Sequence, residues 1–467
     1  MMEFDYVIIG SGAVGSTLAS QLSSLSKVAL IDIGIKPKGH RKRLIPAPYI
    51  NTTSKDFTHG ISGVFGGLTA SWKGKTYLLT EKENKKWPIE YSEFVENSKE
   101  LAFEMNIPHD NINFREKIDK KAFYHRSIRL GRLNLFNYFK IANNKNITCF
   151  EKSTIHDFKY KKGKNKITNL SIINTLGQKT NIKVTKALIL TAGGLGNIPL
   201  YKKFLERIFP NKKSLDTFNL LEQPHISIAK IRKDCNPRIR KPFKGGAKGL
   251  AAEDCLVVKG KSDTYAFQIS DVNIGTNIYR RLETRFKNNL FSNSLILFIR
   301  VLIAMNNKIR KNFFNIRNSF NANIGSIEIW FEDKEKNNSK VTISSRKWFK
   351  KSLDKLNIHY NFSKKNFLTL KSELEKYTNG EIYDFNNQEL KSSQIYVGPK
   401  PGCSTPIKSN PDKGEVNIDL QINGIENLYT LGLNIYPAIG YTNPTWTLMV
   451  LAKRLSKHLI RKFFKSN

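Results

Sequence analysis

Three glycines follow an apolar stretch near the beginning of the chain and are spaced to hold a phosphate-bearing ligand. Within residues 5–22, DYVIIGSGAVGSTLASQL, they are Gly10, Gly12 and Gly15. In a strand–turn–helix unit the first such glycine allows a tight turn, the second lets the backbone approach a pyrophosphate, and the third lets helix and strand pack closely. The N–H groups at the start of the helix then face the phosphates. The spacing therefore predicts a dinucleotide cradle.

An acidic residue follows this cradle where a dinucleotide site needs one. The sequence KVALIDIG places Asp32 at the end of the next apolar run. There its carboxylate can accept a hydrogen bond from a ribose hydroxyl. The order of strand, glycine turn, helix, strand and acid favours FAD or NAD, and the motif alone does not separate these two cofactors.

The distribution of glycine predicts how the chain is divided. Glycine-rich segments lie near the start, in the middle and after residue 395, whereas residues 226–394 contain less glycine and more charge. We predict an α/β fold, in which residues 1–225 and 395–467 form a Rossmann-like cofactor domain. The inserted residues 226–394 are predicted to form an α+β substrate domain containing an antiparallel sheet. Residues 91–145 are predicted to be mostly helical.

The chain is strongly basic, with 77 Lys and Arg residues against 39 Asp and Glu residues and a net charge of +38. Such a charge favours anionic partners, although a drift toward lysine and asparagine throughout the sequence explains it equally well. The four cysteines form no CxxC pair, so neither a metal site nor a disulfide framework is predicted, and a reducing compartment fits. No secretory leader pattern precedes the first strand. We therefore expect a cytoplasmic protein.

One basic and apolar stretch allows two interpretations. Residues 276–320 carry many Lys and Arg residues, and within them the apolar segment 289–307 is interrupted by Arg300. This segment is too short and too charged for a confident membrane span. It is either an amphipathic insertion that contacts an anionic membrane surface or a helix pair that packs on the protein's own core.

Several blocks resemble the glucose–methanol–choline (GMC) family of flavin oxidoreductases. GVFGGLTASWKG, residues 63–74, is similar to the family's GG-x-T-x-x-W signature, which wraps the isoalloxazine end of FAD. WPIEYSEF, residues 87–94, is similar to the branch that oxidises sugars and sugar acids. The resemblance implies FAD as the cofactor. In the first block it implies contacts from Gly66, Gly67, Thr69 and Trp72.

The remaining blocks lie in the middle and at the end of the chain. LILTAGGLGNIPLY, residues 188–201, resembles the family's turn over the adenosine and pyrophosphate, and KSTIHDF resembles the segment that pairs with adenine. Residues 414–455 resemble the family's most specific block. By these matches the further FAD contacts are Ile155, Ala192, Gly193, Gly432, Asn443, Pro444 and Thr445. Ser71 stands where some members carry the histidine that links flavin covalently, so non-covalent FAD is expected.

The family oxidises an alcohol carbon by hydride transfer to flavin N5, while a side chain takes the hydroxyl proton. Asn443 fits the second of two catalytic positions, but residues 392–411 contain no histidine for the first. Three candidates for the missing base remain open, namely His225, Tyr396 and Lys400. A histidine is the usual choice because its pKa lies near neutral pH.

The sequence thus predicts an FAD-dependent oxidoreductase that acts on a CH–OH group, with a small-molecule substrate such as a sugar or a glycoconjugate and no nucleic acid. An alternative is a flavoprotein with other redox chemistry, such as C–C desaturation or double-bond reduction, because the usual histidine is missing. A second alternative is a non-catalytic basic binding protein on a flavin fold, whose affinity for anions would fall with rising salt.

Overall fold

The computed structural model describes most of the chain outside its most basic part. The described residues are 1–37, 44–46, 50–52, 60–72, 74–130, 133–212, 215–223, 225–232, 243–244, 251–259, 264–271, 324–331, 339–348, 351–360, 375–377, 382–383, 395–396, 400 and 402–464. The basic insertion at 276–320 and its apolar segment 289–307 lie outside them. No helix in the described ranges is long and apolar enough to cross a membrane.

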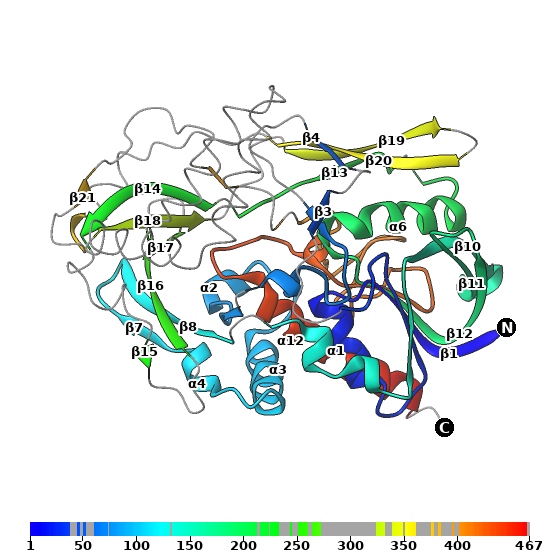
Figure 1. The fold of residues 1–467 in the computed structure, drawn as a ribbon, viewed down its shortest axis with the longest axis horizontal. Coiled ribbons are helices and arrows are strands. Elements are labelled where there is room, and N and C mark those ends of the chain that lie inside the picture. Colours follow the sequence, from blue (N-terminus) through cyan, green and yellow to red (C-terminus); the bar gives the residue numbers. More distant parts are fainter. Residues whose placement is uncertain are drawn as a thin grey trace, which may run out of the picture.

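A mostly parallel sheet forms the centre of the half that was predicted to bind the cofactor (Figure 1). Its parallel strands run in the order β23, β12, β1, β2 and β9, and β11 and β10 extend it antiparallel beyond β12. Their bounds are Met2–Ile9 (β1), Val28–Ile31 (β2), Ile147–Phe150 (β9), Ser153–Lys161 (β10), Lys166–Asn174 (β11), Lys179–Leu190 (β12) and Leu428–Thr430 (β23). The central strands are almost continuously apolar because helices cover them.

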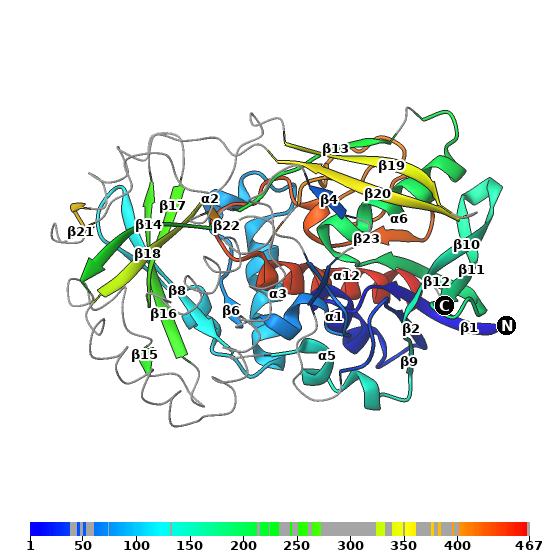
Figure 2. The ribbon, with the colours of Figure 1, turned by 45° about the horizontal axis from the view of Figure 1, so that its top comes forward.

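Helices enclose this sheet and bury its apolar residues. Helix α1, Ala13–Leu22, packs against the C-terminal helix α12, Pro444–Phe464, and α12 packs in turn on α3, Tyr91–Glu104. Helix α6, Gly193–Ile208, lies between the central sheet and a smaller four-stranded sheet (Figures 1 and 2). That smaller sheet has the order β13 (Thr217–Asn219), β19 (Lys340–Trp348), β20 (Lys351–His359) and β4 (Ile50–Thr52).

A large sheet forms the other half of the molecule, and its main strands are paired antiparallel. Its order is β21, β14, β18, β17, β16, β8 and β6, with β7, β15 and β22 paired at its sides. The bounds are Lys75–Thr76 (β6), Arg115–Lys117 (β7), Ala122–Arg129 (β8), His225–Arg232 (β14), Phe243–Lys244 (β15), Ala251–Lys259 (β16), Thr264–Asp271 (β17), Ile324–Phe331 (β18), Ile382–Tyr383 (β21) and Ile395–Tyr396 (β22). The sequence predicted this mixed α/β fold with an antiparallel sheet in the inserted part.

The prediction that residues 91–145 are mostly helical is wrong for their middle part. Helices α3, α4 (His109–Ile112) and α5 (Leu135–Tyr138) lie there, but β7 and β8 fall between them. Strand β8 pairs with β16, whose residues follow it by more than a hundred positions in the chain. Local patterning does not reveal such a partner. The large sheet therefore also includes strands from the segment that was assigned to the cofactor domain.

Short elements complete the described chain. They are β3 (Leu44–Pro46), β5 (Gly60–Ser62), α2 (Glu81–Asn84) and the 3-10 helices Gly67–Ser71, Ile141–Asn143, Lys162–Lys164 and Leu433–Ile435.

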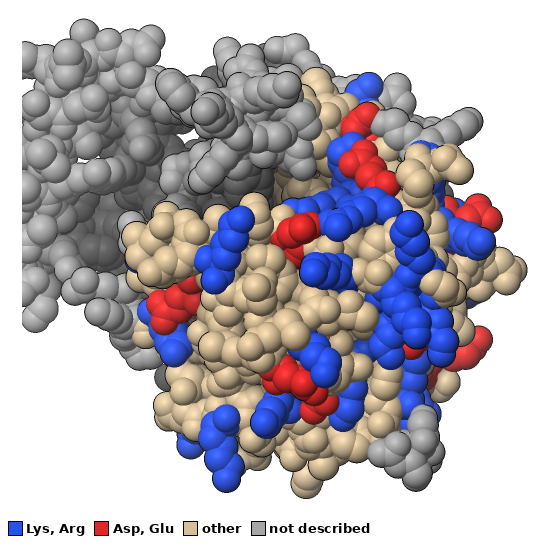
Figure 3. Space-filling model, turned by 90° about the vertical axis from the view of Figure 1, so that its right-hand side faces the viewer, with Lys and Arg blue, Asp and Glu red and all other residues tan. Residues whose placement is uncertain are grey.

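Lys and Arg side chains spread over the face that β10, β11 and β12 form, with Asp and Glu side chains lying between them (Figure 3). Three ion pairs connect neighbouring elements in this region: Lys183 with Glu3, Arg207 with Asp157, and Lys166 with Glu426. Exposed pairs of this kind contribute little to stability. On this face the positive charge is therefore dispersed among acidic groups.

Candidate active site

The predicted cofactor contacts gather where the parallel strands end. Strand β1 leads into the turn at Gly10, β2 into Asp32, β12 into Ala192 and β23 into Gly432. Because the carboxyl ends of parallel strands meet at one edge, these four turns share one side of the sheet. This is the place where open α/β sheets bind their ligands.

The glycines at this edge serve two different physical purposes. A Cβ on Gly15 would lie 1.8 Å from the Gly10 carbonyl oxygen, and one on Gly10 would lie 2.6 Å from the Thr191 carbonyl oxygen. Gly10 also has a φ of +105°, which L side chains rarely adopt. In contrast, a Cβ on Gly12 or Gly193 would meet nothing within 4 Å. Gly10 and Gly15 are therefore needed for backbone packing, while Gly12 and Gly193 border open space.

Two helices begin at this edge without a side-chain cap among the described residues. Helix α1 begins after Gly12 and helix α6 after Ala192; neither has a side-chain cap nor an acidic residue in its first turn. The first N–H groups of a helix have no partner within the helix and carry a partial positive charge. They suit a pyrophosphate.

Asp32 closes one side of this edge. Its carboxylate accepts hydrogen bonds from the Ser11 N–H (2.7 Å), the Ser11 hydroxyl (2.6 Å) and the Gly34 N–H (2.7 Å). Burial raises the pKa of Asp32, against these hydrogen bonds, which lower it. Each carboxylate oxygen has further acceptor capacity. Contact with a ribose hydroxyl stays a prediction.

The segment predicted to hold the isoalloxazine ring lies directly against the cradle. The Gly66 N–H donates to the Ser11 hydroxyl oxygen (3.0 Å), and a Cβ on Gly67 would lie 2.8 Å from the Gly12 Cα. The Thr69 hydroxyl accepts a hydrogen bond from the Leu135 N–H at 3.2 Å, which connects the 3-10 helix Gly67–Ser71 to the start of α5. The indole nitrogen of Trp72 is buried and has no acceptor among the described residues. A buried donor without a partner is costly, so this N–H fits a polar ligand atom.

Ile155 and Gly432 lie close to the predicted binding edge. Ile155 is buried near the start of β10, and the Ser153 N–H two residues earlier donates to the Asp32 carbonyl. A Cβ on Gly432 would lie 3.3 Å from the Gly193 carbonyl carbon, so β23 and the start of α6 approach closely. No observation tests their contact with a cofactor.

Asn443, Pro444 and Thr445 form the start of α12. Pro444 is the first helical residue, a position where its missing N–H costs nothing. The Asn443 side-chain oxygen accepts from the Thr445 hydroxyl at 3.3 Å. The Asn443 amide nitrogen donates to none of the described residues, so it is available to a ligand.

Lys400 is connected to the segment before Asn443, and backbone pairing holds the residues that follow Lys400. Gly402 exchanges two backbone hydrogen bonds with Leu221, and the Cys403 N–H donates to the Leu433 carbonyl at 2.9 Å. The Lys400 ammonium donates to the side-chain oxygen of Gln223. The Gln223 amide donates in turn to the carbonyls of Gly440 (2.9 Å) and Thr442 (3.1 Å). One amide side chain thus connects Lys400 to the backbone immediately before Asn443.

The surroundings of Lys400 favour its neutral form. Burial lowers the pKa of Lys400 to about 7; the nearby Glu222 opposes this shift and the ammonium of Lys75 adds to it. Lys75 itself lies over the ring of Trp330, 4.6 Å from its centroid, and donates to Gln268. A lysine whose pKa lies near neutrality can exchange a proton at physiological pH.

The two other candidates for the missing base lie side by side in the large sheet. His225 in β14 pairs with Tyr396 in β22 through the backbone. Their side chains lie outside the described part of the structure.

Glu83, in helix α2, holds residues 441–442, which directly precede Asn443. Its carboxylate accepts from the N–H groups of Thr80, Tyr441 and Thr442 and from both threonine hydroxyls, at 2.8–3.2 Å. The Tyr441 hydroxyl pairs with the buried His125 Nδ1 at 2.9 Å, and burial holds the pKa of His125 well below its usual value. Residues 441–442 are therefore fixed between two buried polar groups.

Removing the Glu83 carboxylate should destabilise the protein. Glu83→Ala leaves buried N–H groups without acceptors, so we expect the free energy of unfolding to fall by about 2–4 kcal/mol. Urea unfolding measures this change. Glu81→Ala, on the exposed side of the same short helix, should change it by less than about 0.5 kcal/mol. Equal effects of the two variants would contradict the bracing role.

The sequence did not point to Gln223, Lys75 or the His125–Tyr441 pair. Gln223 lies in the stretch LLEQPHI, and its contact with Lys400 spans 177 residues. Lys75 follows the GG-x-T-x-x-W block directly, which was the one local signal available.

The sequence has a distant relative among known proteins. No protein-family model matches the chain. An uncharacterized protein of Methanocaldococcus jannaschii is 25% identical over 256 residues, which are 52% of this chain; the chain spans 62% of that relative's length.

Solved structures match along nearly the whole chain. Pyridoxine 4-oxidase from Mesorbium loti covers 97% of this chain and is itself covered over 98%, with a TM-score of 0.57 and 11% identity. A formate oxidase variant from Aspergillus oryzae covers 100%, is covered over 99% and has a TM-score of 0.53 at 12% identity. An FAD-dependent oxidoreductase from Chaetomium thermophilum covers 99%, is covered over 100% and has a TM-score of 0.58 at 16% identity. This chain has the fold of GMC oxidoreductases, as its sequence blocks predicted.

Proposed function

We propose that this protein is an FAD-dependent oxidoreductase that oxidises a CH–OH group, with Lys400 as the group that accepts the hydroxyl proton. The observation that carries the proposal is the hydrogen-bond path from the Lys400 ammonium through Gln223 to the carbonyl of Thr442, which directly precedes Asn443 in the chain. The full-length fold match to flavin oxidoreductases supports the cofactor.

The residues at the sheet edge fit FAD. The start of α1 and the open space at Gly12 would hold the pyrophosphate, Asp32 a ribose, and the buried Trp72 indole nitrogen a polar atom of the cofactor. Bound FAD supplies an acceptor for the hydride that leaves the alcohol carbon.

The protein's own groups handle the remaining proton and charge. Neutral Lys400 takes the proton from the substrate hydroxyl and becomes an ammonium, which the neighbouring Glu222 carboxylate favours. The free amide N–H of Asn443 donates to the same substrate oxygen while negative charge develops there. Gln223 keeps the Lys400 nitrogen in place.

A lysine in this position supports alcohol oxidation over the alternative redox chemistries. The alternatives were considered because the expected histidine is missing, but a desolvated lysine performs the same proton transfer. We further propose that the substrate is a sugar or glycoconjugate and that FAD is non-covalent. The WPIEYSEF resemblance supports the first, and Ser71 in place of a linking histidine supports the second.

Purified protein should be yellow and should lose its flavin absorption when the correct alcohol is added without oxygen. A panel of sugars, sugar acids and simple alcohols, mixed anaerobically and followed by absorbance, identifies the substrate. Acid precipitation should release the flavin into the supernatant. Colourless protein that takes up no added FAD would refute the proposal, and flavin retained in the pellet would refute non-covalent binding.

A further inference from the structure

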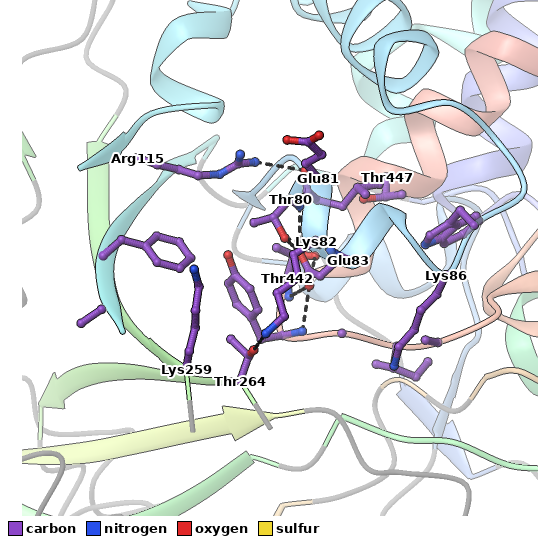
Figure 4. Close-up of a pocket in the computed structure, with 18 of the residues that line it drawn as sticks. Thr80, Glu81, Lys82, Glu83, Lys86, Arg115, Lys259, Thr264, Thr442 and Thr447 are labelled. Atoms are coloured by element: carbon purple, nitrogen blue, oxygen red, sulfur yellow. Dashed lines mark hydrogen bonds between the residues drawn. The ribbon is translucent and has the colours of Figure 1, made fainter. Parts of the chain in front are cut away.

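A cavity lies against the segment that leads into Asn443. It encloses about 690 Å³, and none of the predicted FAD contacts lines it. Its walls come from α2, β7, β8, the ends of β16 and β17, and residues 436–442 (Figure 4). Thr442 lines this cavity and connects it to Lys400, because its N–H donates to Glu83, which also lines the cavity, and its carbonyl accepts from Gln223, which holds Lys400.

The cavity is lined by more positive than negative groups. Among the described residues, six cationic ones line it: Lys82, Lys86, Arg115, Lys117, Lys120 and Lys259. Of the three acidic residues described in its lining, Glu83 is occupied by the donors given above. Asp119 accepts from the N–H groups of Lys121 and Ala122 and from the Tyr377 hydroxyl.

Most of these cations have no acidic partner among the described residues. Arg115 donates to the Leu79 carbonyl and the Tyr91 hydroxyl, both at 3.1 Å, and Lys82 donates to the Thr264 hydroxyl at 3.3 Å. Within the described ranges, none of Lys82, Arg115, Lys117, Lys120 and Lys259 forms an ion pair with a carboxylate. The field of several like charges beside a low-dielectric wall attracts an anion.

Apolar and aromatic side chains form much of the remaining lining, together with the threonines Thr80, Thr264, Thr442 and Thr447. Trp87, Phe123 and Ile439 contribute side chains, and the Lys259 ammonium lies 5.7 Å from the Phe123 ring centroid. Such a wall buries an apolar or planar body, while the cations bind a charged group at its end.

We propose that this cavity binds a small organic anion, that is, a phosphate or carboxylate carried on an apolar or planar body. The inference goes beyond the oxidoreductase function and does not depend on it. Guanidinium and ammonium groups form charge-assisted hydrogen bonds with both kinds of anion.

Isothermal titration of the purified, flavin-containing protein tests this proposal. The probes are phenyl phosphate and benzoate, with inorganic phosphate and acetate as counterparts that lack the ring. At least one ring-bearing probe should bind, and more tightly than its counterpart. The double variant Lys82→Gln/Lys259→Gln should weaken that binding by at least about tenfold.

A matched variant separates this site from general surface charge. Lys162→Gln/Lys164→Gln removes the same charge from the exposed 3-10 turn between β10 and β11, and it should leave binding unchanged. If the first double variant fails to fold, Lys117→Gln/Lys120→Gln replaces it. Equal weakening by the matched variant, or no binding of any probe, would overturn the proposal. Flavin content is measured separately, so a loss of flavin counts against the proposed function alone.

Discussion

Replacing Lys400 with arginine is expected to slow flavin reduction by about 10²–10⁴-fold, the usual contribution of general acid–base catalysis. Arginine keeps the positive charge but cannot lose its proton, so it cannot accept one from the substrate. Because Lys400 does not line the predicted pyrophosphate edge, the variant should retain its flavin. Anaerobic rapid mixing with the substrate that bleaches the wild-type protein measures the rate.

Two further substitutions distinguish a catalytic from a structural role. Lys400→Gln should be as slow as Lys400→Arg, since neither side chain accepts a proton near neutral pH. Lys400→His should recover part of the rate, because imidazole is a base in this range. A wild-type rate in Lys400→Arg, or a Lys400→His variant as slow as the glutamine variant with flavin still bound, would contradict the assignment.

Replacing Gly12 with valine is expected to abolish FAD binding while the protein still folds. A Cβ on Gly12 would meet nothing within 4 Å, so the substitution causes no clash in the protein itself. It would fill the space through which the backbone approaches a pyrophosphate. We expect the FAD dissociation constant to rise by at least about 100-fold, which corresponds to about 2.7 kcal/mol. Fluorescence titration of flavin-free protein with FAD measures it.

Gly163→Val is the matched control for this substitution. Gly163 also has open space around its Cβ direction and lies in the exposed 3-10 turn, far from the binding edge in the chain. Its FAD affinity should equal that of the wild type. A Gly12→Val protein that binds FAD normally, with an unchanged unfolding midpoint, would show that the cradle is not the binding site.

The sequence predicted those parts of the fold that local patterns encode. The apolar run before Gly10 and the acid at Asp32 mark the ends of adjacent strands, and the structure shows both. The apolar periodicity that begins at Pro444 is local in the same way, and the structure forms α12 there, from Pro444 to Phe464. Each of these elements is recognisable because its periodicity and its turn residues lie within one short window.

The remaining features depend on partners that lie far apart in the chain. Strand β8 was expected to be helical because its pairing with β16 is not visible in its own sequence. Lys400 was one of three open candidates, since its lowered pKa comes from burial and from Lys75. Neither burial nor a neighbour 325 positions away, between residues 75 and 400, can be read from a local pattern.

The rate of flavin reduction as a function of pH tests the central claim most directly. Because neutral Lys400 is the active form and its pKa is about 7, the wild-type rate should rise with pH along a single-proton limb centred near pH 7. In Lys400→Arg this limb should be absent. A limb of the same position and height in both proteins would contradict the claim that Lys400 accepts the proton.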